Sequence, residues 1–171
     1  MLAPLVRLIR HRFARDSRRL VSDAALQNLA ALVAASERQH SGEIRICIES
    51  RLPHSYLLRP DAIQAITRER AVAQFGKLRV WDTEHNNGVL IYLQLAERAI
   101  EIVADRGLAS HVTPAMWQAI VQKLGDALQS GQFESGLRQA IAEVSALLSE
   151  HFPQYPGAEN PNELPDLPSR R

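Results

Sequence analysis

Four oxygen-bearing side chains stand at the ends of segments that are predicted to be β-strands. Glu43 opens the first segment, Asp82 and Asn87 precede the second, and Asp105 closes the third. If the first two strands are parallel and the last two form a hairpin, these residues share one edge of a sheet. Carboxylate and amide oxygens are the ligands that Ca²⁺ prefers. The alternative is that polar residues gather at loop ends because strands meet water there.

Other reactive side chains near these segments have simpler explanations. Arg45 in the first strand and Arg106 after the third are candidates for contacting an anion or a partner. Gly107 follows Arg106, where a positive φ would let the chain turn away from the sheet. Cys47, the single cysteine, is expected to be a buried thiol rather than a nucleophile, and one cysteine excludes an intramolecular disulfide framework.

The common catalytic motifs are absent from the sequence. There is no phosphate-binding Gly-rich loop with Lys and Ser or Thr, no Gly-x-Ser-x-Gly elbow and no His-Glu-x-x-His. Asp82, Glu84 and Asn86 have the spacing of the first three calcium-loop ligands, but Asn87 stands where the loop needs Gly and Leu93 where it needs Glu. The sequence therefore contains no EF-hand and favours binding over catalysis, although it does not exclude an enzyme.

The charge is unevenly distributed along the chain. Of 20 basic and 19 acidic residues, the first twenty positions hold six and one, which leaves 14 and 18 in the other 151 residues. This mildly acidic body argues against a nucleic-acid-binding domain, which needs clustered Lys and Arg. The longest apolar run, residues 88–96, is too short to span a bilayer as a helix. Without a secretory signal pattern, the expected location is the cytoplasm.

The first twenty residues form a basic amphipathic arm. Its apolar residues recur at offsets of three and four and so lie on one helical face: Leu2, Leu5, Val6, Ile9 and Phe13. One interpretation is peripheral contact of residues 1–20 with an anionic membrane or a protein partner. The other, which the pattern favours, is a helix that packs its apolar face on the domain.

Three strands are predicted in the body. Residues 43–49 alternate strictly, with isoleucines on one face and polar residues on the other. Residues 88–95 are a continuous apolar run, typical of a central strand covered on both faces. A tight connection at Ala96, Glu97 and Arg98 leads to a third strand over 99–105, so the last two strands form a hairpin.

Helices are predicted around these strands. One begins at Ser22 or Asp23, one runs from Pro60 to about Phe75, and two more cover 114–130 and 133–148. Beyond Phe152 the chain carries five of its nine prolines and few apolar residues, which predicts a disordered tail. The element order indicates an α/β domain: a three-layer α/β/α sandwich whose small mixed sheet contains one βαβ crossover and the hairpin.

Four segments together resemble the TPM domain family. They are SGEIRICIE, RVWDTEHNNGVLIYL, ERAIEIVADRGL and GQFESGLRQAIAEVSALLSEHFP, and the match covers about residues 22–152. The ending Asn160–Asp166 is similar to that of the short bacterial form of the family. The resemblance implies the sandwich fold, acid phosphatase activity and calcium binding in some relatives, and an acidic site that corresponds to Asp82, Asn87 and Asp105.

These inferences divide the chain into an arm (1–20), a TPM-like domain (21–152) and a Pro-rich tail (153–171). The leading functional hypothesis is a module that binds a calcium-like cation or a partner through Asp82, Asn87, Asp105 and Glu43. One rival is an acid phosphatase that uses the same edge. The other is a membrane or protein tether that uses the arm. The sequence does not specify the oligomeric state.

Overall fold

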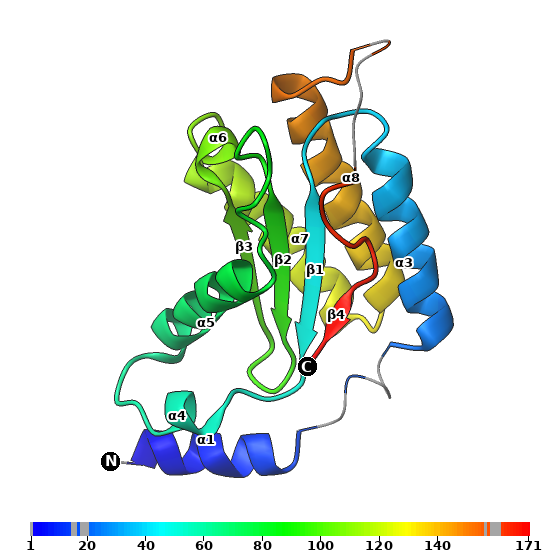
Figure 1. Ribbon diagram of the computed structural model, residues 1–171. Coiled ribbons are helices and arrows are strands. Elements are labelled where there is room, and N and C mark those ends of the chain that lie inside the picture. Colours follow the sequence, from blue (N-terminus) through cyan, green and yellow to red (C-terminus); the bar gives the residue numbers. More distant parts are fainter. Residues whose placement is uncertain (1, 15–16, 18–20, 156, 158–161) are drawn as a thin grey trace.

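The computed structural model describes residues 2–14, 17, 21–155, 157 and 162–171. A mixed sheet lies between helices on both faces (Figure 1). β1 (Ile44–Glu49) is parallel to β2 (Val89–Gln94), and β2 is antiparallel to β3 (Ala99–Ala104). The two-residue β4 (Ser169–Arg170) pairs with β1, which gives the order β3-β2-β1-β4. The predicted crossover, hairpin and three-layer α/β/α sandwich are confirmed.

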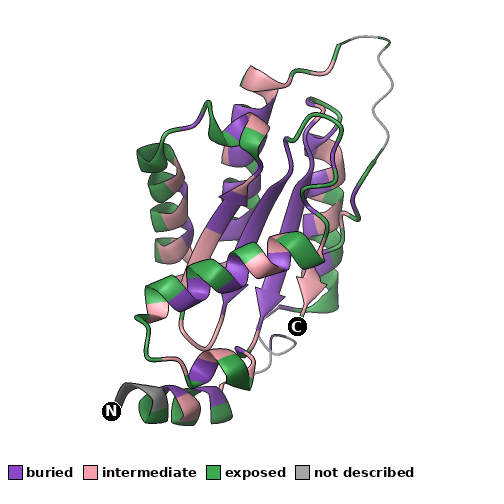
Figure 2. Ribbon diagram, turned by 60° about the vertical axis from the view of Figure 1, so that its left-hand side comes forward, coloured by how far each residue is buried: buried purple, intermediate pink, exposed green. Residues whose placement is uncertain are grey.

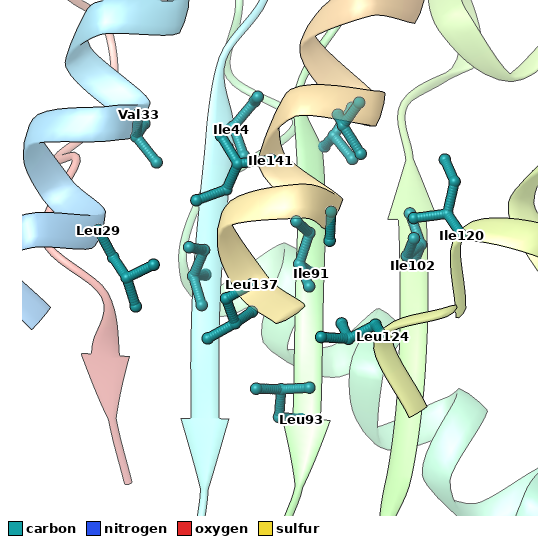
Figure 3. Packing of buried hydrophobic residues seen from close by; sticks show 14 of the residues in the cluster. Leu29, Val33, Ile44, Ile91, Leu93, Ile102, Ile120, Leu124, Leu137 and Ile141 are labelled. Atoms are coloured by element: carbon teal, nitrogen blue, oxygen red, sulfur yellow. The ribbon is translucent and has the colours of Figure 1, made fainter. Parts of the chain in front are cut away.

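The larger part of the core lies between the sheet and three helices. These are α3 (Asp23–Ser36), α7 (Pro114–Gln129) and α8 (Phe133–His151), and their apolar side chains interdigitate with those of the strands (Figure 3). The isoleucines of β1 and alternate residues of β2 point to this face. The period-two pattern of the sequence therefore identified the core side of β1 correctly.

The opposite face is covered by α5 (Ile63–Lys77). This helix begins three residues later than predicted, because Ala62 is the N-cap and still has extended backbone angles. Cys47 is fully buried under it, as expected, and burial raises the pKa of its thiol to about 12. Beside it Arg70 and Tyr92 both donate to the buried Glu49 carboxylate, with Arg70 Nε 2.9 Å and Tyr92 Oη 2.6 Å from Glu49 Oε2.

Local signals set several helix ends. The Ser22 hydroxyl accepts from the Ala25 N–H at the start of α3, and Thr113 does the same for Met116 at the start of α7. Gly131, with φ +74°, follows α7 in the left-handed conformation that glycine adopts without strain. These boundaries follow directly from the sequence because each depends on contacts within a few residues.

The tail prediction was wrong for residues 162–171, which pack against the body. Leu164 is buried, and Arg45 donates to the carbonyl oxygens of Pro165 and Leu167. The Arg171 N–H donates to Ile48 O at 3.0 Å and continues the pairing along β1. Composition did not reveal this attachment because it depends mainly on backbone groups and a distant arginine, with Leu164 as a buried apolar side chain among residues 162–171.

Three further helices, short or peripheral, lie in the described part of the chain. α1 (Leu2–Arg12) and α4 (His54–Leu57) lie together at the end of the sheet where the β2–β3 hairpin turns, and α6 (Arg106–Ala109) lies at the opposite end (Figure 1). Among the described residues, no helix has the length and apolar character that crossing a membrane requires.

Candidate functional site

The start of β2 and the end of β3 meet at one edge of the sheet, beside the start of β1. Val89 pairs with Ile44 on one side and with Ala104 on the other. The Asp105 N–H donates to Gly88 O at 2.8 Å, so the residues that flank the hairpin strands are held side by side. This edge lies next to α6 (Figure 1). The expected placement of Asn87 and Asp105 at one sheet edge is therefore found.

Asn87 is fully buried and only partly hydrogen-bonded. Its backbone N–H donates to Thr83 Oγ1 at 3.1 Å, and its side-chain Nδ2 donates to Ser41 Oγ at 3.2 Å. The side-chain oxygen Oδ1 is buried and has no hydrogen-bond partner among the described residues. Asn87 therefore presents an unused acceptor at this edge.

Asp105 has a similar arrangement. It is buried and caps α6, with Oδ1 accepting from the Arg106 N–H at 2.7 Å. Its second oxygen, Oδ2, is buried and has no hydrogen-bond partner. The same edge thus holds two buried acceptor oxygens, one from an amide and one from a carboxyl group, that no donor in the described part of the chain satisfies.

The loop before β2 is fixed against the start of α6 by a glycine. The Gly107 N–H donates to Asn86 O at 2.9 Å. A Cβ at position 107 would lie 2.6 Å from the carbonyl oxygens of both His85 and Asn86, so any larger residue would separate the loop from the helix. Gly107 is not among the positive-φ residues. The sequence identified an important glycine, but its role is close approach rather than an unusual φ.

Asp82 does not join this pair. It is exposed and forms an ion pair with Arg79, three residues earlier. Thr83, the next residue, is buried and is the one that contacts Asn87. The sequence placed Asp82 in the correct loop but could not show that a neighbouring arginine would pair with it at the surface.

Glu43 lies at the edge but interacts with the tail. Its carboxylate oxygens accept from the N–H groups of Glu163 and Leu164 at 3.2 and 3.3 Å. Burial raises the pKa of Glu43 to about 7 despite these hydrogen bonds. Glu37, which sequence reasoning missed, accepts from the Ile44 N–H at 2.9 Å, and burial raises its pKa to about 8. Glu43 therefore belongs to a buried acidic pair under the tail.

The two arginine candidates have different surroundings. Arg45 is buried and its guanidinium binds tail carbonyls, so its partner is the chain itself. Arg106 is exposed, and its side chain has no hydrogen bond or ion pair with the described residues. Of the two, only Arg106 offers a charge to an external ligand near Asp105.

The two unpaired oxygens at this edge are of types that bind hard cations. Asn87 Oδ1 and Asp105 Oδ2 are of the types that Ca²⁺ prefers, and the Ser41 hydroxyl lies against the Asn87 amide. In the part of the chain that the structure describes, no three His, Cys, Asp or Glu side chains gather as a metal site. A cation here would therefore depend on one carboxylate, neutral oxygens and water. Ser41 was missed because a serine in a short connection carries no distinctive signal.

Comparison with known proteins agrees with this architecture. The family model described as the TPM domain matches residues 14–147. The NMR structure of BA42 protein from the psychrophilic bacterium Bizionia argentinensis is similar, with a TM-score of 0.73 and 24% identity, over 88% of this chain and 95% of that one. No curated protein matches. Since the family model covers well over half of the sequence, the chain belongs to the TPM domain family.

Proposed function

We propose that this protein binds a divalent oxygen-preferring cation, with Ca²⁺ as the best candidate, at the edge formed by Asn87 and Asp105. The observation that supports the proposal is the pair of buried oxygens, Asn87 Oδ1 and Asp105 Oδ2, that lack hydrogen-bond donors. A buried acceptor without a donor costs about 1–3 kcal/mol. A bound cation would offset this cost at both atoms.

The composition of the site also supports an estimate of its affinity. Only one carboxylate contributes, and the affinity of oxygen sites for Ca²⁺ falls as the number of charged ligands falls. We expect a dissociation constant on the order of 10⁻⁴–10⁻³ M, the range of weak calcium modules. Such a site would respond to millimolar rather than micromolar Ca²⁺.

Calorimetric titration with CaCl₂, with the melting temperature measured in parallel, tests the proposal. Asp105→Asn removes the only carboxylate of the site and should abolish the heat of binding and the rise in melting temperature. Asp82→Asn is the matched control, because Asp82 is exposed and paired with Arg79. No binding by the native protein, or equal loss in both variants, would contradict the proposal.

Acid phosphatase activity at the same edge is the alternative that the family resemblance raises. Hydrolysis of a phosphate monoester needs a metal pair or an activated nucleophile. The Ser41 hydroxyl contacts the Asn87 amide rather than a general base. Turnover of a chromogenic monoester that is lost in Asp105→Asn and retained in Asp82→Asn would favour catalysis over simple binding.

A further inference from the structure

α1 is attached to the body through its polar side chains. Arg7 is buried, and its guanidinium donates to the carbonyl oxygens of Arg59 and Asp61, each at 3.1 Å. Leu8 packs against the small cluster that contains Leu57. These contacts hold α1 against α4 and the loop that follows it.

A second anchor lies one turn later on the same side of α1. The buried His11 accepts from the Leu52 N–H through Nδ1 at 3.1 Å, and its Nε2 lies 2.9 Å from Glu97 Oε1. With Nδ1 accepting, Nε2 carries the proton and donates to the carboxylate. Burial lowers the pKa of His11, which favours this neutral form. The inward side of α1 is therefore fixed by hydrogen bonds.

The apolar side of α1 faces solvent as a result. Its exposed fractions are 55% for Leu5, 51% for Val6, 54% for Ile9 and 79% for Phe13. We call these residues, three in α1 and Phe13 directly after it, the α1 apolar face; Figure 2 colours part of α1 as exposed. The sequence pattern favoured a helix that packs this face on the domain. That interpretation was wrong, because backbone carbonyls near α4 bind Arg7 and turn the helix the other way.

An apolar groove continues from this face onto the body. It has a volume of about 930 Å³ and runs beside the hairpin turn and the α7–α8 connection. Its apolar lining includes Ile9, Phe13, Leu95, Ile100, Leu128 and Phe133. Large contiguous apolar surfaces of this kind are rare on soluble proteins unless something binds them.

Positive charge surrounds this apolar surface. Arg10 and Arg98 line the groove, and the Arg10 side chain is 51% exposed although it pairs with Glu97. Arg12 and Arg98 are exposed, and neither side chain has a hydrogen bond or ion pair with the described residues. Arg15, Arg18 and Arg19 follow in the sequence and lie outside the described residues. The rest of the chain is mildly acidic overall, with 14 basic and 18 acidic residues outside the first twenty positions.

We propose that α1 docks this protein on an anionic phospholipid bilayer. The α1 apolar face would enter the boundary between headgroups and acyl chains, and the flanking arginines would meet lipid phosphates. Arginines beside an exposed apolar helix face are the pattern of interfacial helices, so we commit to lipid as the occupant. Repulsion between the anionic surface and the mildly acidic body would orient the body away from the bilayer. This inference does not depend on the cation site, which lies at the opposite end of the sheet and would face away from the membrane (Figure 1).

Co-sedimentation of the full chain with vesicles tests the proposal. Vesicles of phosphatidylcholine with 30% phosphatidylglycerol are compared with phosphatidylcholine alone, at low and high NaCl. We expect binding only to the anionic vesicles, weakened by salt. The double variant Ile9→Asp/Phe13→Asp should bind at least tenfold more weakly. Met116→Asp is the control, because it adds a charge at an exposed apolar position on α7.

A second variant tests the contribution of the arginines to lipid binding without disturbing the fold. Arg12→Glu/Arg98→Glu reverses two exposed charges without altering the apolar face or the buried anchors, and we expect reduced binding to anionic vesicles with an unchanged circular dichroism spectrum. The proposal is overturned if anionic vesicles do not sediment the protein, if Ile9→Asp/Phe13→Asp binds as well as the native chain, or if neutral vesicles bind equally. A dimer in ultracentrifugation that this apolar-face variant dissociates would also overturn it, because a second copy would then cover the face.

Discussion

At one end of the sheet, where β2 begins and β3 ends, two buried oxygens lack hydrogen-bond donors; at the other end, beside the hairpin turn, α1 leaves four large apolar side chains in solvent. At the first end, two buried acceptor oxygens have no donor among the described residues. At the second end, apolar side chains have no other part of the described chain packed over them. The two proposals assign a different kind of ligand to each end, a cation to the first and a lipid surface to the second. If both hold, one small domain separates two binding chemistries by placing them at opposite ends of its strands.

Among the described residues, a few buried side-chain atoms lack a hydrogen-bond partner, and Asn87 Oδ1 and Asp105 Oδ2 are two such acceptor oxygens at the same edge of the sheet. The clearest contrast is Glu49 at the last residue of β1, whose carboxylate accepts from Arg70 and Tyr92. Both Glu49 and Arg70 are almost fully buried. A satisfied carboxylate should be essential for folding, whereas an unsatisfied one should contribute little stability. This difference can be measured.

Arg70→Ala should give the largest loss of stability. It leaves the buried Glu49 carboxylate without its cation, and removing one partner of a buried ion pair typically costs about 3–5 kcal/mol. Urea denaturation measures the loss. Arg68→Ala, on the same helix, removes a half-exposed arginine from its pair with Glu101 and should cost less than about 1 kcal/mol. Similar losses in the two variants would mean that the Glu49 network is not a main source of stability.

Raising the pH should weaken the fold through the acidic pair Glu37 and Glu43. Burial raises their pKa values to about 8 and about 7, above the ordinary value of 4.5, so both are protonated in the folded state at pH values where the unfolded chain has lost the protons. The contribution of these two protonated carboxyl groups to the free energy of unfolding is present at acidic pH and is lost as the pH rises through about 7 to 8. We expect the free energy of unfolding to fall by about 1–3 kcal/mol between pH 6.5 and 8.5.

The pH range begins at 6.5 so that the titration of a second buried group, His40, does not affect the measurement. Burial lowers the pKa of His40 to about 4, so its contribution is lost only as pH falls below about 6.5, with the opposite sign. Glu37→Gln keeps the acceptor for the Ile44 N–H and should flatten the pH dependence between 6.5 and 8.5. A stability that rises with pH in the native protein would show that these carboxyl groups are ionised in the folded state.

Asp105→Asn should have the smallest effect on stability when no divalent cation is present. Asn retains an oxygen that can cap α6 and replaces a carboxylate oxygen that has no donor. We expect a change of less than about 1 kcal/mol in urea denaturation with a chelator present. A loss as large as that of Arg70→Ala would show that Asp105 is structural and would remove the contrast between the two carboxylates.

Most of the fold could be predicted from local patterns. The alternation in β1 and the apolar run of β2 identify strands, while Thr113 and Gly131 mark helix ends through contacts with near neighbours. The hairpin follows from the short connection and brings Asn87 and Asp105 to one edge. These features depend on interactions between residues close in sequence or on the regular geometry of a sheet. Both can be inferred from the spacing of residue types along the chain.

Long-range polar contacts could not be predicted in this way. Arg45 holds tail carbonyls more than a hundred residues away, and Arg7 holds carbonyls some fifty residues away. Any segment offers backbone carbonyls, so no residue type signals where such an arginine will bind. For this reason the ordering of the tail, the position of Glu43 beneath it and the exposed face of α1 were missed.

The most direct test of the account is a Ca²⁺ titration followed residue by residue in ¹H–¹⁵N correlation spectra. The cation proposal predicts that saturable shifts concentrate on the amides of residues 41–43, 83–88 and 104–107, that α1 does not respond, and that Asp105→Asn removes the shifts. Shifts centred instead on Glu163 and Asp166 of the tail, or no saturable shifts at millimolar Ca²⁺, would contradict it.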